Sequence, residues 1–484
     1  MLPILLKLQP LFIPSLIILT GWATVVTVFK KDSAVGLVFY VSLIIIVDSY
    51  LNTGIYIPGF EYGSIRYSEA LLVFLFVGAP KKTARSGVHR LLAVLMGLYF
   101  ILLFYSALRG LTLIDGLNNF RRFMVPQFLT LWIAQRGFRK AEDYQRFFSF
   151  MIVLLILIGL FTFWDVFFDR ILLKSASINS PEYYVNRKNG RFGSFFLNPI
   201  DLGDFTVLLL PIMLLVARVQ RALPRRIILW AGLMLFAFAF VKTQSRGPMI
   251  GCLVSVILFA LLPYKKFPLR RRIASILMMV LLLSVFLPGF YETATRRFAN
   301  IEQETSLNDV SRRSTWDHVI DKLILPHPLF GIGLGEAKFI RSMHETGFVD
   351  EFGSTLDNPH NSYLEIALAA GFPAALIFVV VNLLVIGTNI SFMRRNVEEE
   401  RSLLLLGLTS GIGGFLIATI TGQDMFRISV APVYWLMVGL CISITSAAPK
   451  PIRPIARLTK PTPLTGSSAG AFRTAPRGLG QSRG

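Results

Sequence analysis

Long apolar runs separated by short polar loops dominate the chain. About 17–25 apolar residues are enough to cross a bilayer as a helix. Runs of roughly this kind lie at 11–29, 34–51, 91–108, 147–168, 199–217, 225–241, 247–263, 272–287, 372–390, 402–421 and 428–447, with weaker candidates at 66–79 and 120–135. A barrel would instead alternate polar and apolar residues. The pattern therefore predicts an all-α polytopic membrane protein with about 11–13 transmembrane helices.

The spacing of the runs predicts the organisation of the chain. Five segments follow: N-terminal transmembrane helices over 1–168, central ones over 169–287, one large extracytoplasmic helical loop over 288–371, C-terminal transmembrane helices over 372–447, and a basic tail over 448–484. The tail is rich in Pro, Gly, Ser and Arg, so we expect it to be disordered and cytoplasmic. The apolar N-terminus continues into a full-length run, which argues against a cleavable signal peptide.

Composition supports the membrane interpretation and leaves one alternative to settle. Of the 484 residues, 54% are hydrophobic and 16% are charged, against roughly 25% charged in a soluble domain. The net charge of +21 would suggest nucleic acid if the protein were soluble. Alternate loops and the tail, however, contain 29 Lys and Arg and six acidic residues, a net of +23 that leaves −2 for everything else. Such sorting follows the positive-inside rule, and no nucleic-acid partner is expected.

The same sorting gives a topology. The basic loops and the C-terminus are predicted to lie inside, and the loops 169–198 and 288–371 outside. The N-terminus lies outside only if both weaker runs cross the membrane. Both cysteines, Cys252 and Cys441, lie in apolar runs, and five histidines are scattered without ligand spacing. We therefore expect no disulfide framework and no metal site.

Two arginine motifs fall on the predicted outer side. Arg191 opens a segment that ends in Asn198 and Pro199, an N-cap followed by a first helical residue. Arg246 lies in a tight turn between two spans. A solvated loop residue is the alternative for Arg191, and an interfacial arginine for Arg246. The outer position of Arg246 runs against the basic bias and favours a function.

The large outer loop supplies two further candidates. Residues 310–325 are predicted to form an amphipathic helix, and Arg312 lies four residues before Trp316 on its apolar face. An arginine there needs an anionic partner or a polar cavity, although a cap-region arginine is the alternative. His360 precedes a helical run and can act as a general base near neutral pH, although a hydrogen-bonded turn histidine is the alternative.

A glycine-rich stretch, 328–335, does not connect a strand to a helix, so close backbone packing explains it better than a dinucleotide site. The arginine and histidine motifs fit a single binding site. Three outer arginines suit a diphosphate, because guanidinium forms bidentate bonds to phosphate oxygens. A histidine beside them suits deprotonation of an attacking hydroxyl, so the diphosphate would belong to a lipid-linked donor at the membrane.

The ordered motifs resemble the O-antigen ligase/O-antigen polymerase family. They are the Arg191–Pro199 segment, Ser245-Arg246-Gly247, Arg312 with Trp316, Pro328 to Gly335, and Pro359 to Leu364. The similarity covers roughly 185–390, and the spacing between Phe195 and Asn198 is one residue longer than in the family pattern.

The resemblance implies a multi-spanning transferase of the bacterial inner membrane with its active site on the periplasmic side. Such enzymes transfer or polymerise undecaprenyl-diphosphate-linked oligosaccharide without a cofactor or metal. In this sequence Arg246 and Arg312 would hold the diphosphate and His360 would orient or deprotonate the acceptor hydroxyl. Arg191, Asn198, Trp316, Asn361 and Tyr363 would bind substrate. Membrane lipids, a lipid-linked donor and a glycan or lipid A-core acceptor are the implied partners.

Alternatives remain open at this stage. A polymerase of O-antigen or exopolysaccharide uses a second lipid-linked glycan as acceptor, a ligase uses lipid A-core, and a protein-directed oligosaccharyltransferase is a third option. We lean towards the polymerase, because no feature specifies a lipid A-core acceptor. A secondary transporter is the alternative from another class, and it would favour ionisable residues at mid-membrane depth.

Overall fold

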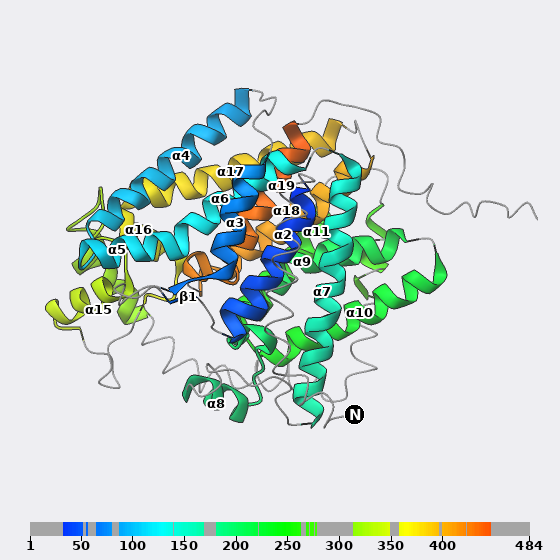
Figure 1. Ribbon diagram of the computed structural model, residues 1–484, viewed down its shortest axis with the longest axis horizontal. Helices are drawn as coiled ribbons and strands as arrows, with labels where there is room; N and C mark the ends of the chain where they lie inside the picture. The colour runs from blue at the N-terminus through cyan, green and yellow to red at the C-terminus, as the bar shows by residue number, and fades with distance from the viewer. Residues whose placement is uncertain are drawn as a thin grey trace, which may run out of the picture. The chain divides into compact units, whose positions relative to one another are not determined.

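The computed structural model describes the following parts of the chain: 32–51, 55–56, 64–79, 87–138, 140–168, 181–220, 222–262, 268–270, 272–274, 276–277, 313–348, 358–395, 399–422 and 424–446. These residues are almost entirely helical, which confirms the all-α prediction (Figure 1). A small exception is the antiparallel pair of β1 (Ile55–Tyr56) and β2 (Ser64–Ile65). The expected basic tail lies outside the described residues.

The N-terminal half consists of consecutive helices. They are α2 (Ser33–Leu43), the π-helical η1 (Ile44–Leu51), α3 (Tyr67–Gly78), α4 (Gly87–Leu108), α5 (Leu113–Asn119), the π-helical η2 (Phe120–Met124), α6 (Val125–Gly137) and α7 (Ala141–Phe168). Both weaker candidate runs are therefore helical, as α3 and as η2 with α6. Side chains start two of these helices, because Asp32 caps α2 and Thr112 caps α5.

The second half contains the remaining helices. They are α8 (Pro181–Lys188), the 3₁₀ turn η4 (Ser194–Phe196), α9 (Pro199–Val219), α10 (Leu223–Thr243), α11 (Arg246–Leu261), the π-helical η5 (Val319–Ile324), α15 (Glu336–Glu345), α16 (Ser362–Ala370), α17 (Phe372–Arg395), α18 (Glu399–Ala418), the 3₁₀ turn η6 (Asp424–Phe426) and α19 (Ala431–Ser446). As expected, Asn198 caps α9 by accepting a hydrogen bond from the Ile200 amide, and Pro199 is its first residue.

Within the described residues, six helices are long and apolar enough to span a membrane, and four shorter apolar helices accompany them. The long helices are 87–108, 142–168, 199–217, 223–243, 372–395 and 400–418. The expected run at 11–29 lies outside the described residues, as does most of the run at 272–287. The polytopic prediction is confirmed by these helices.

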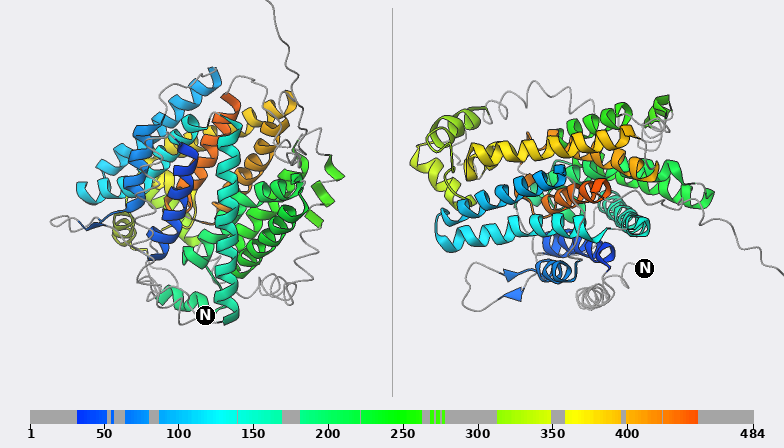
Figure 2. Two further views of the ribbon diagram at one scale, coloured as in Figure 1. Left: turned by 45° about the vertical axis from the view of Figure 1, so that its right-hand side comes forward. Right: turned by 90° about the horizontal axis from the view of Figure 1, so that it is seen from above.

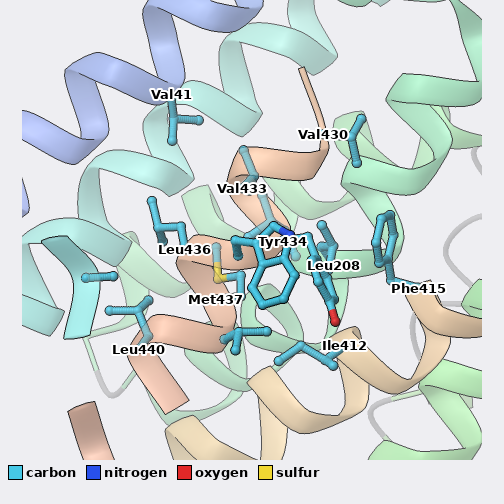
Figure 3. Packing of buried hydrophobic residues seen from close by; sticks show 14 of the residues in the cluster. Val41, Leu208, Ile412, Phe415, Val430, Val433, Tyr434, Leu436, Met437 and Leu440 are labelled. Carbon is cyan, nitrogen blue, oxygen red and sulfur yellow. The ribbon is translucent and has the colours of Figure 1, made fainter. Parts of the chain in front are cut away.

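A buried centre and apolar outer faces fit a bilayer environment. Helix α19 forms the centre, where Tyr434 packs among Leu208, Ile412 and Phe415 (Figure 3). In contrast, α4 and α17 lie side by side and expose large apolar side chains, including Ile101, Leu376 and Leu383 (Figures 1 and 2). Apolar surface of this kind is normal where the surrounding solvent is lipid.

The outer-loop helices form a second, smaller core against α16. Val319, Leu323 and Ile324 are buried there with Phe339 and Met343. These first three residues belong to the apolar face predicted for 310–325, and the described part of that helix, 313–324, confirms it.

The glycine-rich stretch packs its backbone closely, as the sequence indicated. The amides of Ile332 and Gly333 donate to the carbonyls of Leu368 and Ala369, at 2.8 and 3.2 Å. Gly333 has φ +115°, and a Cβ atom there would lie 2.2 Å from the carbonyl oxygen of Arg109. Only glycine fits, because it accepts positive φ and leaves room for the neighbouring backbone. The stretch thereby joins α16 to the end of α4.

Candidate active site

Arg191 is bound to the turn that carries Arg246. Its Nε donates to the carbonyl oxygen of Thr243 at 3.3 Å, and its Nη2 donates to the Ser245 hydroxyl at 3.2 Å. The amide of Phe192 donates to the carbonyl of Lys242 at 2.9 Å. The two motifs, some fifty residues apart, therefore form one connected unit.

Arg246 is the first residue of α11, directly after Ser245 at the N-cap. The N-terminus of a helix has free amide groups and a positive dipole end, so this position favours anions. A Cβ atom on the neighbouring Gly247 would lie 2.1 Å from Oγ1 of Thr421. The Arg246 turn therefore packs directly against the segment that follows α18.

The His360 turn is fixed on two sides. The Ser362 amide donates to the carbonyl of Thr419 at 3.0 Å, and the Ser362 hydroxyl donates to the carbonyl of Gly422 at 2.9 Å. From the outer loop, Nε1 of Trp316 donates to the carbonyl of Pro359 at 2.7 Å. These bonds hold the backbone on either side of His360.

Residues 419–422 thus connect the motifs, because Gly247 packs on Thr421 and Ser362 bonds to Thr419 and Gly422. Through this segment the structure brings together the parts of the chain that carry Arg191, Arg246, Trp316 and His360. Arg312 lies outside the described residues. The sequence did not indicate the importance of 419–422, which is a short polar interruption between two apolar runs.

Backbone strain is concentrated in the same motifs. In the described part of the chain, four residues other than glycine have positive φ: Ser194 (54°), Leu197 (62°), Gln244 (49°) and His360 (49°). All four belong to the three segments that contain Arg191, Arg246 and His360. Each such residue costs about 1–3 kcal/mol and persists only where its surroundings enforce it, most often at functional sites.

The remaining predicted site residues bond to the backbone. The Asn361 side chain accepts from the amides of Tyr363 and Leu364 and so caps α16. The Tyr363 hydroxyl donates to the carbonyl of Leu416 at 2.7 Å. Together with the bond from Trp316, these contacts position the His360 turn.

A cavity of about 610 Å³ lies beside this turn. Its polar lining includes Asp48, Arg66, Asn119, Arg122, Tyr183, Asn186, Asn198, Asp201, Glu336, Asn358, Glu365, Arg427 and Ser429. Of the predicted site residues Asn198 lines it, whereas Arg191, Arg246 and His360 are not among the described residues of its wall. Pro359, directly before His360, is part of the wall. The cavity and the His360 turn are therefore neighbours.

Sequence reasoning missed the arginines of this cavity. Arg66 and Arg122 stand at the ends of the two weaker runs, and Arg427 follows α18. Arg427 lies 3.8 Å from Oδ1 of Asp201, and the other carboxylate oxygen of Asp201 accepts from the Ser429 hydroxyl at 2.6 Å. The sequence feature that could have identified these three arginines is the one that singled out Arg246: each is a basic residue on the predicted outer side of the membrane.

Two carboxyl groups form a buried pair next to Asp201. The charges of Asp204 and Asp424 act on each other, and the two residues are 0% and 1% exposed. Burial raises the pKa of Asp424 above its usual value. Two carboxylates in such contact repel each other, so a proton between them is favoured. Among the described residues, no group of three or more His, Cys, Asp or Glu side chains is arranged to hold a metal ion.

These features define a polytopic α-helical membrane protein with a strained arginine and histidine site. Residues 206–379 match the family model described as O-antigen ligase. The matched range includes Arg246, Arg312 and His360, and it leaves Arg191, Asn198 and the N-terminal helices outside. No curated protein matches the chain. The resemblance expected from the motifs is confirmed over this range.

Proposed function

We propose that the protein transfers or polymerises undecaprenyl-diphosphate-linked oligosaccharide during assembly of a surface polysaccharide, O-antigen or exopolysaccharide. The site would lie on the periplasmic side of the bacterial inner membrane. The observation that carries this proposal is the convergence of the Arg191, Arg246 and His360 segments on residues 419–422. The family description favours transfer over transport.

Each residue has a separate role in the proposed transfer reaction. The oxygen of the acceptor hydroxyl attacks C1 of the donor sugar, and the bond from C1 to the phosphate oxygen breaks. His360 orients the hydroxyl and takes up its proton. The leaving diphosphate keeps the bonding electron pair, and Arg246 and Arg312 bind it and stabilise its charge. Arg191 holds the Arg246 turn in place through Ser245.

The other predicted residues act at a distance from the reacting atoms. Asn198 lines the cavity and contacts the glycan there. The polar side-chain atoms of Trp316, Asn361 and Tyr363 are engaged with the backbone, so these residues position the His360 turn. The acceptor is a second lipid-linked glycan in a polymerase and lipid A-core in a ligase.

The test is complementation of a deletion strain, with analysis of its surface glycans. Single-repeat glycans in the deletion strain would indicate a polymerase, and long chains left on the lipid carrier a ligase. The His360→Ala variant should lose transfer by at least about 100-fold, the usual contribution of a general base. His344→Ala, an exposed histidine of α15, is the matched control and should complement fully. Full complementation by His360→Ala at normal membrane levels would refute the role of His360.

A further inference from the structure

Helix α8 contributes two residues to the wall of the 610 Å³ cavity. They are Tyr183 and Asn186, which are three residues apart and therefore share one face of the helix. Tyr184 and Val185, on the other side of α8, are 54% and 58% exposed. One face of α8 thus lines the cavity, although the helix precedes the range of the family match.

Arg187 fixes the orientation of this face. Its Nη1 donates to Oδ1 of Asp165, near the end of α7, and to the Tyr183 hydroxyl at 3.2 Å. The side chains of Arg187 and Asp165 are 15% and 8% exposed, so water competes little for this charge-assisted bond. Arg187 therefore anchors α8 to a helix long enough to span the membrane and positions Tyr183 in the cavity wall.

The turn after α8 leads directly to the turn that carries Arg246. The Arg191 amide donates to the Asn186 carbonyl at 2.9 Å. The Arg191 guanidinium donates to the hydroxyl of Ser245, the residue before Arg246, at 3.2 Å. The Gln244 side chain adds a bond to the carbonyl of the residue before Arg191, at 3.3 Å. A residue that lines the cavity is therefore two hydrogen bonds away from the Arg246 turn.

We infer that Tyr183 and Asn186 bind the sugars of the donor substrate beside its diphosphate, and that Arg187 is a positioning residue for them. The inference rests on the proposed function, which assigns the donor diphosphate to Arg246. The sugar bonded to the diphosphate is its immediate neighbour, and α8 is the part of the wall joined to the Arg246 turn. A tyrosine ring packs against the C–H face of a sugar, and a carboxamide donates to and accepts from its hydroxyls.

This assignment separates two tasks of the donor site. Arg246 contacts the diphosphate, which is the same in every undecaprenyl-diphosphate-linked donor. Tyr183 and Asn186 contact the glycan, which differs between donors. Helix α8 therefore determines which glycan the protein accepts, whereas the Arg246 turn recognises the class of donor.

The test measures binding of two lipid probes to the full-length protein in detergent. One probe is undecaprenyl diphosphate, which has no sugar, and the other is the lipid-linked glycan extracted from the deletion strain. Asn186→Ala and Tyr183→Ala should each weaken binding of the glycan-bearing lipid about threefold to tenfold, the effect of about one hydrogen bond, and leave undecaprenyl diphosphate unaffected. Asn189→Ala removes an exposed asparagine from the turn after α8, and as the matched control it should change neither affinity.

Two further variants separate positioning from diphosphate binding. Arg187→Lys keeps the positive charge but lacks the guanidinium fork, so it should weaken binding of the glycan-bearing lipid alone. Arg246→Gln should weaken binding of both probes, because both carry the diphosphate.

Two results would overturn the inference. One is an unchanged affinity of Asn186→Ala and Tyr183→Ala for the glycan-bearing lipid. The other is an equal loss of both probes in these variants, because a sugar contact cannot affect a lipid that has no sugar. Binding is measured without turnover, so the complementation result for His360→Ala bears on the proposed function alone.

Discussion

His360 combines a reactive side chain with a backbone conformation that its neighbours impose. Its amide donates to the Asn358 side chain at 2.9 Å, and its φ of 49° is left-handed. Histidine tolerates this region better than most residues do. The type and order of the motif residues could be read from the sequence. Their backbone strain could not, because it depends on two bonds between distant segments, from Trp316 to the carbonyl of Pro359 and from Ser362 to the carbonyl of Gly422.

At the same scale, Asp424 predicts a pH dependence of stability. Burial raises its pKa above the ordinary value of 3.8, so just above that pH the folded state holds a proton that the unfolded chain has released. Stability should therefore fall as the pH rises from about 4 towards neutral. Thermal unfolding in detergent across this range measures the slope. Asp424→Asn should flatten it, whereas Asp317→Asn, an exposed outer-loop residue, should retain it. An equal slope in Asp424→Asn would contradict the assignment.

At the scale of elements, α11 and α18 approach each other through glycines. A Cβ atom on Gly251 would lie 2.7 Å from the carbonyl oxygen of Gly414, and one on Gly414 would lie 2.4 Å from that of Gly251. Small residues allow such close packing between membrane helices. The contact matters for function, because α11 begins at Arg246 and α18 leads into residues 419–422.

Substitutions at this contact should be destabilising. Gly251→Ala and Gly414→Ala should each lower the stability by about 1–3 kcal/mol, since extra atoms in a close-packed contact force the backbone apart. The midpoint of thermal unfolding in detergent is the measurement. Gly97→Ala, in α4, meets no atom within 4 Å and serves as the control, with little change expected. Equal stability of Gly251→Ala and Gly97→Ala would show that α11 and α18 are not tightly packed here.

The helices themselves were largely predictable, because the apolar runs are long and their polar interruptions are short. Even the weaker runs at 66–79 and 120–135 are helical. The cavity was not predictable, since its wall combines residues of η1, α8, 332–335 and 426–429. Each of these segments is unremarkable alone, and their proximity depends on tertiary packing.

At the scale of the whole molecule, the charge sorting predicts which loops lie outside. After replacement of Cys252 and Cys441 by alanine, Leu329→Cys should react with an impermeant maleimide added to right-side-out spheroplasts. Glu142→Cys should react only after lysis, because 136–146 is a basic loop. Both positions are exposed in the structure, so burial does not explain a difference. Labelling of Glu142→Cys in intact spheroplasts would reverse the topology and place the His360 site inside.

The backbone contacts of the glycine-rich stretch have an evolutionary consequence. Leu334 donates to the Ser106 carbonyl at 3.1 Å, and a Cβ on Gly335 would lie 3.0 Å from Oδ2 of Asp115. Residues 106–119 and 331–335, more than two hundred residues apart in the sequence, are therefore in close contact. Recombination that joined 106–119 from one parent to 331–335 from another would bring together surfaces never selected to match. Related chains that acquire a new glycan specificity should inherit both regions together.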